Sequence, residues 1–415
     1  MSELRPRSTA RSIKTAGIAR HGRLRKTGPW GAIFAFIGGA LAVLLVSTTA
    51  VAGIVATQLV NQVADGGVIL VGDTEGPPPS IGAYPGGFNM LIVGSDKCES
   101  NDGCEGRGSA NLNDVTMLLH VSADGTNATA VSFPRDLVVP FPSCPQADGT
   151  GFTGAMAGRP INETLYYGGL PCTVLTVEAL TGLKIQFAGL ITFNGVIQMA
   201  NAVGGVEVCV TEKLDDHYVG LHLNKGKQTI SGRDALAFLR SRHGVGDGSD
   251  LTRISSQQVF LSSLVRTLKS KETLGDPLKV YKLAQAATSA MELSQGLRQL
   301  DTLYSIAAKL KDIPLENVTF VQFPGRTGVT TPAMYAGKVA PIQDRANALF
   351  AKIRADEPFK LAQVGDAEGG SAKDPDAPKP SDSPSSTSTA APVKVDTIAG
   401  IKGQTAADYT CSIPN

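Results

Sequence analysis

The chain has 415 residues and a net charge of +1 at pH 7. Residues 1–27 hold eight Lys and Arg residues and one acid, Glu3, so they contribute +7 and the remainder carries −6. A mildly acidic body lacks the basic surface that nucleic acid requires, which excludes a DNA-binding domain there.

An uncharged stretch from Gly28 to Ala64 follows the basic residues. Because about 20 apolar residues cross a bilayer as a helix, we predict a transmembrane helix at 29–60. The basic head, 1–28, predicts a cytoplasmic N-terminus and a single-pass plasma-membrane protein whose bulk lies on the cell-wall side. A cleaved signal peptide is the alternative, since small residues lie around Ser47–Ala52. The apolar stretch exceeds the core of about 7–15 residues in such signals, which favours the uncleaved anchor.

The rest of the chain divides by composition. Residues 61–86 are rich in Gly and Pro, which predicts a linker. We expect 87–362 to form one extracytoplasmic domain. Residues 363–392 are rich in Asp, Pro and Ser and bury too little apolar surface to fold, so we predict disorder there. A short end, 393–415, follows and is pinned to the domain if Cys411 forms a disulfide.

Short apolar runs alternate with helical patterns inside the domain. We expect strands at Asn89–Val93, Val115–Val121, Ala128–Phe133, Ile185–Thr192 and Val206–Val210. Helices are expected at Val174–Leu180, Val196–Val203, after an N-cap at Ser231, and at Gln257–Leu268, Tyr281–Leu293 and Leu300–Leu310. Strands interleaved with helices predict an α/β sandwich.

Six cysteines all lie beyond the predicted anchor, and none forms a CxxC pair or has histidines spaced for zinc. An even number on the oxidising side of a membrane favours disulfides. Sequence leaves the pairing open. The pairs we expect are Cys98–Cys104, Cys144–Cys172 and Cys209–Cys411.

A set of acids and arginines spread along the domain carries the chemistry. Its members are Asp96, Asp114, Arg135, Arg240, Arg242, Arg253 and Gln257. Carboxylates suit Mg²⁺, while guanidinium groups bind phosphate through paired hydrogen bonds. Beyond a membrane anchor, such a set indicates a lipid-linked phosphate substrate.

Short strings around these residues resemble the LytR-CpsA-Psr family. They follow the family order over about 88–270 and are NMLIVGSD (Asn89–Asp96), NDVTMLLHV (Asn113–Val121), SFPRD (Ser132–Asp136), IN (Ile161–Asn162), GGVEV (Gly204–Val208), ALAFLRSRH (Ala235–His243) and DLTRISSQQ (Asp250–Gln258). The cysteines and the long polar tail are similar to the actinobacterial, mycolic-acid-bearing branch.

The resemblance implies a fold and an activity. The fold is a central mixed β-sheet flanked by helices, with an apolar pocket for a polyprenyl chain. The activity is Mg²⁺-dependent transfer of a glycopolymer from a polyprenyl-pyrophosphate carrier to peptidoglycan, with Mn²⁺ as an alternative metal. Arabinogalactan is the glycan expected in the actinobacterial branch.

The resemblance also assigns residues. Asp96 and Asp114 fall on the metal-binding carboxylates, and Asp250 on an acid near the same head group. The pyrophosphate-binding positions are Arg135, Arg240, Arg242, Arg253 and Gln257, and we expect Arg135, Arg253 and Asp250 to be catalytic. Leu112, Pro160 and Ser256 depart from basic positions of the family. Arg107 and Arg159 are nearby substitutes for the first two.

A long isoprenoid tail needs an apolar groove, because each buried CH₂ contributes about 0.8 kcal/mol. We predict that Val174–Leu180, Val259–Leu268 and Ala284–Leu293 line it. The alternative is that these residues are ordinary core.

Other functions stay open at this point. A pyrophosphatase would use the same site with water as the acceptor. A non-catalytic lipid-binding protein would need only the groove. A transcriptional regulator is opposed by the predicted topology, which leaves about 27 residues in the cytoplasm, too few for a DNA-binding domain.

Overall fold

The computed structural model describes residues 67–71, 84, 87–96, 111–146, 149–274, 276–365, 370–378 and 396–415. The chain divides into two compact units, Met1–Gln58 and Leu59–Asn415. All described residues belong to the second. The predicted head, anchor and Cys98–Cys104 pair lie outside the described residues, as do Arg107 and most of the linker. Within the described ranges, no helix has the length and apolar character needed to cross a membrane.

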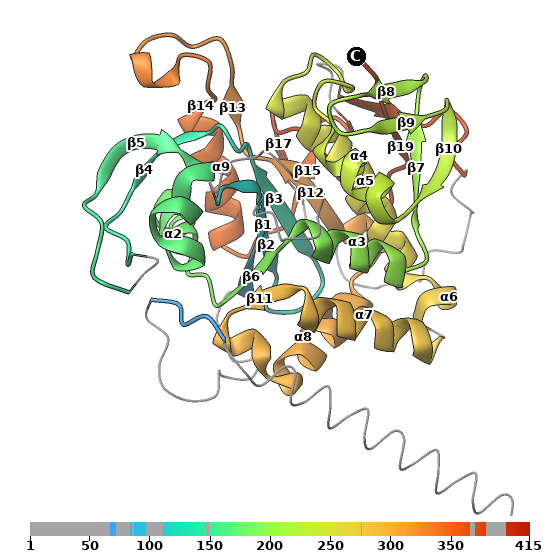
Figure 1. The fold of residues 1–415 in the computed structure, drawn as a ribbon, viewed down its shortest axis with the longest axis horizontal. Helices are drawn as coiled ribbons and strands as arrows, with labels where there is room; N and C mark the ends of the chain where they lie inside the picture. The colour runs from blue at the N-terminus through green and yellow to red at the C-terminus, as the bar shows by residue number, and fades with distance from the viewer. Residues whose placement is uncertain are drawn as a thin grey trace, which may run out of the picture. The chain divides into compact units, whose positions relative to one another are not determined.

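A seven-stranded mixed sheet forms the centre of the second unit (Figure 1). Two antiparallel pairs, β1–β2 and β2–β3, make up its middle, while β6 and β12 run parallel to β1 and β3. Antiparallel strands β11 and β18 close its edges. In sheet order the strands are β11 (Met291–Leu293), β6 (Phe187–Ile191), β1 (Phe88–Ser95), β2 (Asn113–Val121), β3 (Ala128–Phe133), β12 (Val318–Gln322) and β18 (Gly403–Thr405). The mixed sheet predicted from sequence is confirmed.

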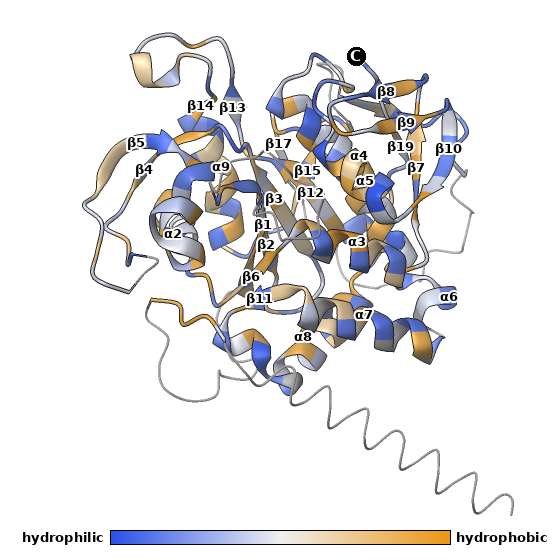
Figure 2. Cartoon of the chain, in the orientation of Figure 1, coloured by the Kyte–Doolittle hydropathy of each residue, from blue (hydrophilic) through white to orange (hydrophobic). Residues whose placement is uncertain are grey.

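Helices cover both faces of this sheet. Alternate side chains of β1 point to opposite sides, as a pleated strand requires. Leu91 and Val93 pack with helices α2 (Thr164–Thr181) and α9 (Gln343–Arg354). Met90 and Ile92 pack with α5 (Asp250–Lys269) and α8 (Leu300–Asp312) on the other side. Figure 2 shows hydrophobic and hydrophilic residues alternating around α8, as expected of a helix with one buried side. The result is the helix–sheet–helix sandwich that the sequence predicted.

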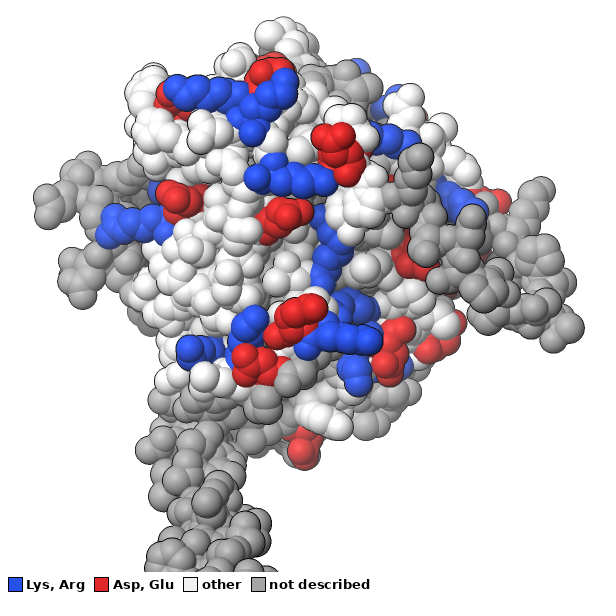
Figure 3. Space-filling model, turned by 90° about the vertical axis from the view of Figure 1, so that its right-hand side faces the viewer, with Lys and Arg blue, Asp and Glu red and all other residues white. Residues whose placement is uncertain are grey.

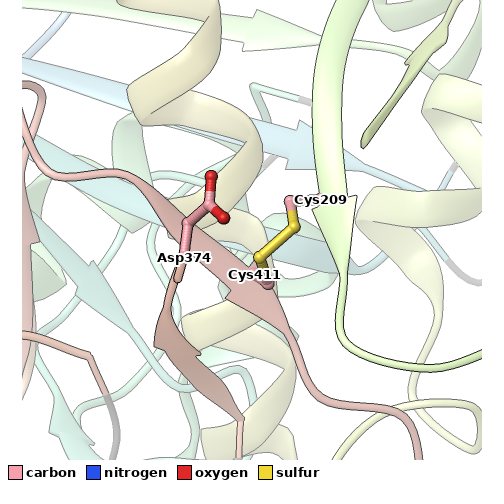
Figure 4. A group of neighbouring side chains, drawn as sticks. All are labelled: Cys209, Asp374 and Cys411. Atoms are coloured by element: carbon pink, nitrogen blue, oxygen red, sulfur yellow. A yellow bond between two sulfur atoms is a disulfide. The ribbon is translucent and has the colours of Figure 1, made fainter. Parts of the chain in front are cut away.

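A second sheet of four strands joins the chain's C-terminal residues to its middle. The order is β10 (Gly226–Ile230), β7 (Val206–Val210), β19 (Thr410–Ser412) and β16 (Ser371–Lys373). A disulfide between Cys209 and Cys411 links β7 to β19 (Figure 4). The predicted pinning of Cys411 is therefore confirmed, and so is the Cys144–Cys172 disulfide.

The prediction of disorder across 363–392 is wrong for the residues that form β16. This strand lies inside the polar stretch and pairs antiparallel with β19, with Ser371 opposite Ser412. Ser371 is buried despite its polar side chain. This segment is ordered by main-chain hydrogen bonds to a neighbouring strand, so its low apolar content did not predict its structure.

The remaining elements surround the two sheets. The helices are α3 (Phe193–Ala202), α4 (Gly232–Arg240), α6 (Lys271–Leu274) and α7 (Pro277–Ser289). The short strands are β4 (Val138–Phe141), β5 (Met156–Pro160), β8 (Leu214–Asp216), β9 (Leu221–Leu223), β13 (Gly325–Arg326), β14 (Ala340–Pro341), β15 (Phe359–Leu361) and β17 (Asp396–Ile398). Short 3-10 helices cover Ile161–Glu163, Gln295–Arg298, Leu315–Asn317 and Ala333–Tyr335.

Two local predictions need correction. Ser231 occupies the N-cap position of α4, but its side chain makes no capping hydrogen bond. The helix expected over Tyr281–Leu293 ends at Ser289, and Met291–Leu293 forms β11 instead. The cause is tertiary, because these residues complete the sheet by pairing with the edge of β6.

Candidate functional site

The two predicted metal-binding acids lie at one end of the β1–β2 pair. Asp96 follows β1, and Asp114 is the second residue of β2. A register shift between Gly94 and Ser95 sets the geometry of this end. The carboxylate Oδ1 of Asp96 accepts a hydrogen bond from the Leu112 main-chain N–H at 2.8 Å. Adjacent strands thus bring the two acids, 18 positions apart, to the same edge of the sheet.

Arg135 follows β3 and reaches back to this edge. Its Nη1 donates to Asp114 Oδ1 at 2.5 Å, and its main-chain N–H donates to Asp250 Oδ2 at 2.7 Å. Burial acts to lower the pKa of the Arg135 guanidinium, but Asp114, Asp136 and Asp250 together raise it. Arg135 is therefore a permanent cation held by three acids.

The first turns of α5 carry three of the predicted site residues, Asp250, Arg253 and Gln257. Ser249 caps this helix, and its hydroxyl accepts a hydrogen bond from the Thr252 N–H at 3.3 Å. Arg253 Nη2 lies 2.6 Å from Asp250 Oδ1 and donates to the Asp114 carbonyl at 2.9 Å. Asp250 is 2% exposed and Arg253 is 4% exposed. Both oxygens of Asp250 thus contact the two arginines, which fixes where Arg135 and Arg253 lie.

Arg240 and Arg242 approach from the end of α4. The Arg240 guanidinium lies over the Phe193 ring, 4.2 Å from its centroid. Arg242 Nε donates to the Gly248 carbonyl at 3.0 Å, and its Nη1 lies 3.8 Å from Asp136. The Asp136 carboxylate also lies 3.2 Å from the Lys338 ammonium group. Asp136 therefore links the SFPRD turn to the loop after α4.

The titration of Asp96 places it in the same electrostatic neighbourhood. Burial raises the pKa of Asp96 most, and the Asp114 charge raises it further. The Leu112 N–H, Arg135 and Arg240 act in the opposite direction. Asp96, Asp114, Arg135 and Arg240 thus share one local field, so these distant residues converge as the sequence predicted.

Two arginine nitrogens in the cluster are buried and lack a hydrogen-bond partner among the described residues. They are Nε of Arg135 and Nε of Arg253. A buried N–H without a partner is destabilising, and an added phosphate oxygen would satisfy it. The two neighbouring carboxylates, Asp96 and Asp114, repel each other, and a divalent cation would relieve that repulsion. Carboxylate oxygens are also the ligands that Mg²⁺ prefers, so the residues fit both groups.

A cavity of about 250 Å³ opens from this cluster between the sheet and helices α3, α4 and α5. Its polar lining residues are Ser95, Asp114, Thr192, Arg240, Arg253 and Gln257, whereas Asp96, Arg135 and Arg242 do not line it. The Gln257 side chain donates to the Leu239 carbonyl at 2.8 Å. The rest is largely apolar and includes Ile92, Met117, Ile191, Phe193, Val196, Met199, Leu236, Leu239, Phe260, Leu261, Leu264, Leu268 and Leu283.

The predicted lining is right for one segment and wrong for two. Within Val259–Leu268, four residues of α5 line the cavity. Val174–Leu180 does not, because α2 covers the opposite face of the sheet and packs there with Leu91 and Val93. Ala284–Leu293 contributes none of the lining residues, and the wall from α7 is Leu283.

Arg159 does not join the cluster. It lies in β5, where its Nε is 3.2 Å from Glu163 and its guanidinium contacts Tyr167. Ser256, where the family commonly has arginine, is buried and hydrogen-bonds to Ser412 of β19. The C-terminal strand therefore occupies the direction in which a longer side chain would extend.

Asp216 is a residue of this region that sequence reasoning missed. It is 1% exposed, and its Oδ2 accepts hydrogen bonds from Ser241 Oγ at 2.8 Å and the Gly244 N–H at 3.0 Å. The Arg242 N–H also donates to it, at 3.3 Å. Burial acts to raise the pKa of Asp216, but these hydrogen bonds lower it overall. Asp216 thus shapes the loop that carries Arg242, and no spacing in the sequence distinguishes it from the exposed Asp215.

One other group of ligand-type side chains occurs within the described ranges, at Cys209, Asp374 and Cys411. It is unsuited to a metal, because both sulfurs are joined in a disulfide (Figure 4). The Asp374 carboxylate lies 2.8 Å from the Lys227 ammonium group. Figure 3 shows basic and acidic side chains interspersed on one face of the molecule, without an extended basic patch on that face.

Comparison with known proteins decides the family. The model of the LytR_cpsA_psr family matches residues 73–350. The chain belongs to this family. Its fold is also that of a LytR-Csp2A-Psr enzyme from Actinomyces oris, at 22% identity and a TM-score of 0.52, over 69% of this chain and 95% of the other. Bacillus subtilis TagV gives 20% identity and a TM-score of 0.51, over 65% and 96%.

Curated relatives of this LytR-CpsA-Psr protein include two from Corynebacterium glutamicum, which agrees with the predicted actinobacterial branch. The cell wall biosynthesis protein LcpA is 30% identical over 340 residues, 76% of this chain and 63% of LcpA. The probable cell wall biosynthesis protein LcpB is 32% identical over 230 residues, 54% and 52%. The chain thus spans less than two thirds of the length of either. TagT of Bacillus subtilis, a polyisoprenyl-teichoic acid–peptidoglycan teichoic acid transferase, is 25% identical over 305 residues, 68% and 87%.

Proposed function

We propose that this protein is a membrane-anchored transferase on the cell-wall side of the plasma membrane. It moves a glycopolymer from a polyprenyl-pyrophosphate carrier to a hydroxyl of peptidoglycan. One observation carries the proposal: Asp114, Arg240 and Arg253 of the arginine–aspartate cluster, with Gln257, line an otherwise largely apolar cavity. Such a site matches a ligand with a pyrophosphate head and a hydrocarbon tail. The names of TagT and of other relatives, teichoic acid transferases that use polyisoprenyl carriers, support it.

The guanidinium groups bind the pyrophosphate. Arg135 and Arg253 each have a buried Nε that makes no hydrogen bond to a described residue, although Nε of Arg135 lies 3.9 Å from Asp136. Arg240 and Arg242 add charge beside them. Phosphoryl transfer depends mainly on positioning and on neutralising charge in the transition state. The acceptor hydroxyl loses its proton to solvent as its oxygen bonds to the phosphorus next to the glycan, the bond from that phosphorus to the bridging oxygen breaks, and lipid monophosphate leaves.

Asp96 and Asp114 would hold Mg²⁺, or Mn²⁺ in its place. A divalent cation there supplies charge neutralisation for phosphate oxygens. We assign Asp250 to positioning, because its carboxylate is buried against Arg135 and Arg253 and faces no solvent. The chain's own acids thus divide between holding a cation and holding arginines.

The apolar wall would hold the polyprenyl tail. Leu261, Leu264 and Leu268 lie one α-helical turn or so apart on α5 and all line the cavity. Each buried CH₂ of a lipid contributes about 0.8 kcal/mol, so even part of the tail adds substantial affinity. The glycan we expect is arabinogalactan, in keeping with the Corynebacterium relatives.

The test uses the full-length protein in detergent with a polyprenyl-pyrophosphate-linked arabinogalactan and peptidoglycan fragments. We expect glycan on the fragments and lipid monophosphate in equal amounts. Lipid monophosphate without wall-bound glycan would support the pyrophosphatase alternative. Release of neither product, with Mg²⁺ or Mn²⁺ present, would overturn the proposal.

A further inference from the structure

A second cavity, of about 270 Å³, lies beside the end of β12. Its wall comes from the β12–β13 region, from the first turn of α9, and from residues close to the C-terminus. The lining residues with polar side chains are Gln322, Arg326, Thr327, Arg345 and Lys402. Gly400 and Lys402 come from beyond residues 73–350, the part that matches the family model. The cavity is therefore a feature of this chain in addition to the family domain.

The charge of this cavity has one sign. Arg326, Arg345 and Lys402 line it, and its described lining has no acidic residue. The structure holds two of these residues in place from the main chain: Arg345 Nη1 lies 3.4 Å from the Gly400 carbonyl, and the Gln322 N–H donates to the Lys402 carbonyl at 3.0 Å. Three cations in one concave site favour an anionic ligand.

Gln322 gives a second and independent indication of a ligand. Its side chain is 4% exposed and lines the cavity, yet its Oε1 has no hydrogen-bond partner among the described residues. An unpaired buried carbonyl oxygen is destabilising, so it requires a donor from outside the chain. The adjoining helix α9 also begins without a side-chain cap. The complementary ligand therefore carries both an oxyanion and an N–H or O–H donor.

The cavity lies close to the arginine–aspartate cluster. Leu251, which lines it, follows Asp250 directly. The Phe323 N–H donates to the Ser132 carbonyl at 2.8 Å, and Ser132 precedes Arg135 by three positions. The first turn of α5 and the end of β3 thus adjoin both sites. A polymer that reacts at the cluster can reach this cavity with another of its groups.

We infer that the second cavity binds the acceptor, through a carboxylate of a peptidoglycan peptide with its neighbouring amide N–H. This inference rests on the proposed function. The carboxylate pairs with Arg326, Arg345 and Lys402, and the amide N–H donates to Gln322 Oε1. The donor's pyrophosphate is the group assigned to the arginine–aspartate cluster, which is why the acceptor is the better occupant of this second, separate cationic cavity.

Binding is measured on the full-length protein in detergent with a soluble disaccharide-tetrapeptide from peptidoglycan. The test variant combines Arg326→Gln with Lys402→Gln, and the control combines Lys271→Gln with Lys311→Gln, two exposed lysines outside the cavity. A charge-assisted contact contributes about tenfold in affinity or more, so we expect the test variant to weaken binding about a hundredfold. The control variant and a peptide with amidated carboxylates separate this effect from net charge.

The same variants are assayed for turnover. We expect the KM for the acceptor to rise while the KM for the donor, and the melting temperature, stay unchanged. Unchanged acceptor binding in the test variant would overturn the inference, as would equal binding of the amidated peptide. If inorganic phosphate displaces the peptide and binds as tightly as the peptide does, the cavity would be assigned to the phosphate groups of the donor instead.

The two proposals fail in different ways. If glycan transfer occurs and the acceptor KM is unchanged by Arg326→Gln with Lys402→Gln, the acceptor site is refuted and the transferase proposal stands. Cation-dependent peptide binding without any glycan transfer would refute the transferase and leave the binding site standing.

Discussion

The two cavities differ in how their arginines are held. In the cluster beside the first, Arg135 and Arg253 contact Asp114 and Asp250, so acids of the chain fix them before any ligand arrives. In the second, the described lining has cations and no acid, and the main chain at Gly400 and Gln322 supports them. Fixed guanidiniums suit a reacting group, since catalysis depends on positioning. A cationic cavity whose described lining has no acid suits the recognition of an anionic group on a polymer.

The largest expected effect concerns the segment that builds the second cavity. Replacing Cys209 and Cys411 by Ser removes a cross-link between residues 202 positions apart. Loops of this length lose about 4–5 kcal/mol of stability without their disulfide. We expect chemical denaturation to show such a loss, and acceptor binding to weaken more than donor binding. Equal losses in both would show that the two cavities are not independent. The double Cys144→Ser, Cys172→Ser variant is the control for disulfide removal elsewhere.

Arg135→Gln tests the arginine–aspartate cluster alone. Loss of one fixed donor to a developing charge lowers turnover about 10²–10³-fold. Glycan transfer measured with saturating donor should fall by that factor, while disaccharide-tetrapeptide binding stays unchanged. Arg159→Gln is the matched control, because Arg159 contacts Glu163 and Tyr167 instead of the cluster. A comparable loss in the control would contradict the assignment.

Asp216→Asn tests whether Asp216 positions the loop that carries Arg242. The change removes a buried charge that accepts hydrogen bonds from Ser241 and Gly244, each contributing about 1.5–3 kcal/mol when one partner is charged. We expect a lower melting temperature and a roughly tenfold loss of transfer, a rate factor equal to about 1.4 kcal/mol. Asp215→Asn, at a neighbouring side chain that is 49% exposed, should leave both unchanged. If both variants had the same melting temperature and the same transfer rate, Asp216 would have no role in positioning Arg242.

The smallest effect is a pH dependence of the stability of the whole fold. His120 is buried, and burial lowers its pKa, although Asp356 acts to raise it. The unfolded chain then takes up a proton near pH 6.5 that the folded chain resists. Stability is therefore complete above pH 6.5 and is lost as the pH falls towards the lowered value. We expect the melting temperature to decrease over that window and His120→Gln to flatten the slope. A slope that persists in His120→Gln would place the titrating group elsewhere.

Strands in both sheets followed from sequence because they are short apolar runs. Ala128–Phe133 and Val206–Val210 were predicted with their observed bounds. The convergence of Asp114, Arg135 and Arg253 followed from family motifs. The structure adds that Arg135 and Arg253 share the acid Asp250.

Other features left no local signal. Ser371–Lys373 forms a strand because Thr410–Ser412 lies beside it, a pairing about 40 residues distant in the chain. Helical periodicity in Val174–Leu180 identified a helix but could not say which face of the sheet it covers. Asp216 and Gln322 are polar residues whose roles depend on burial, which only the tertiary structure supplies.

The most direct measurement is a structure of the full-length protein with a polyprenyl-pyrophosphate-linked sugar bound. The account predicts phosphate oxygens within hydrogen-bond distance of Nε of Arg135 and Nε of Arg253, and the tail against Leu261 and Leu264 of α5. Phosphates bound instead among Arg326, Arg345 and Lys402, or a tail that leaves the apolar cavity empty, would contradict it.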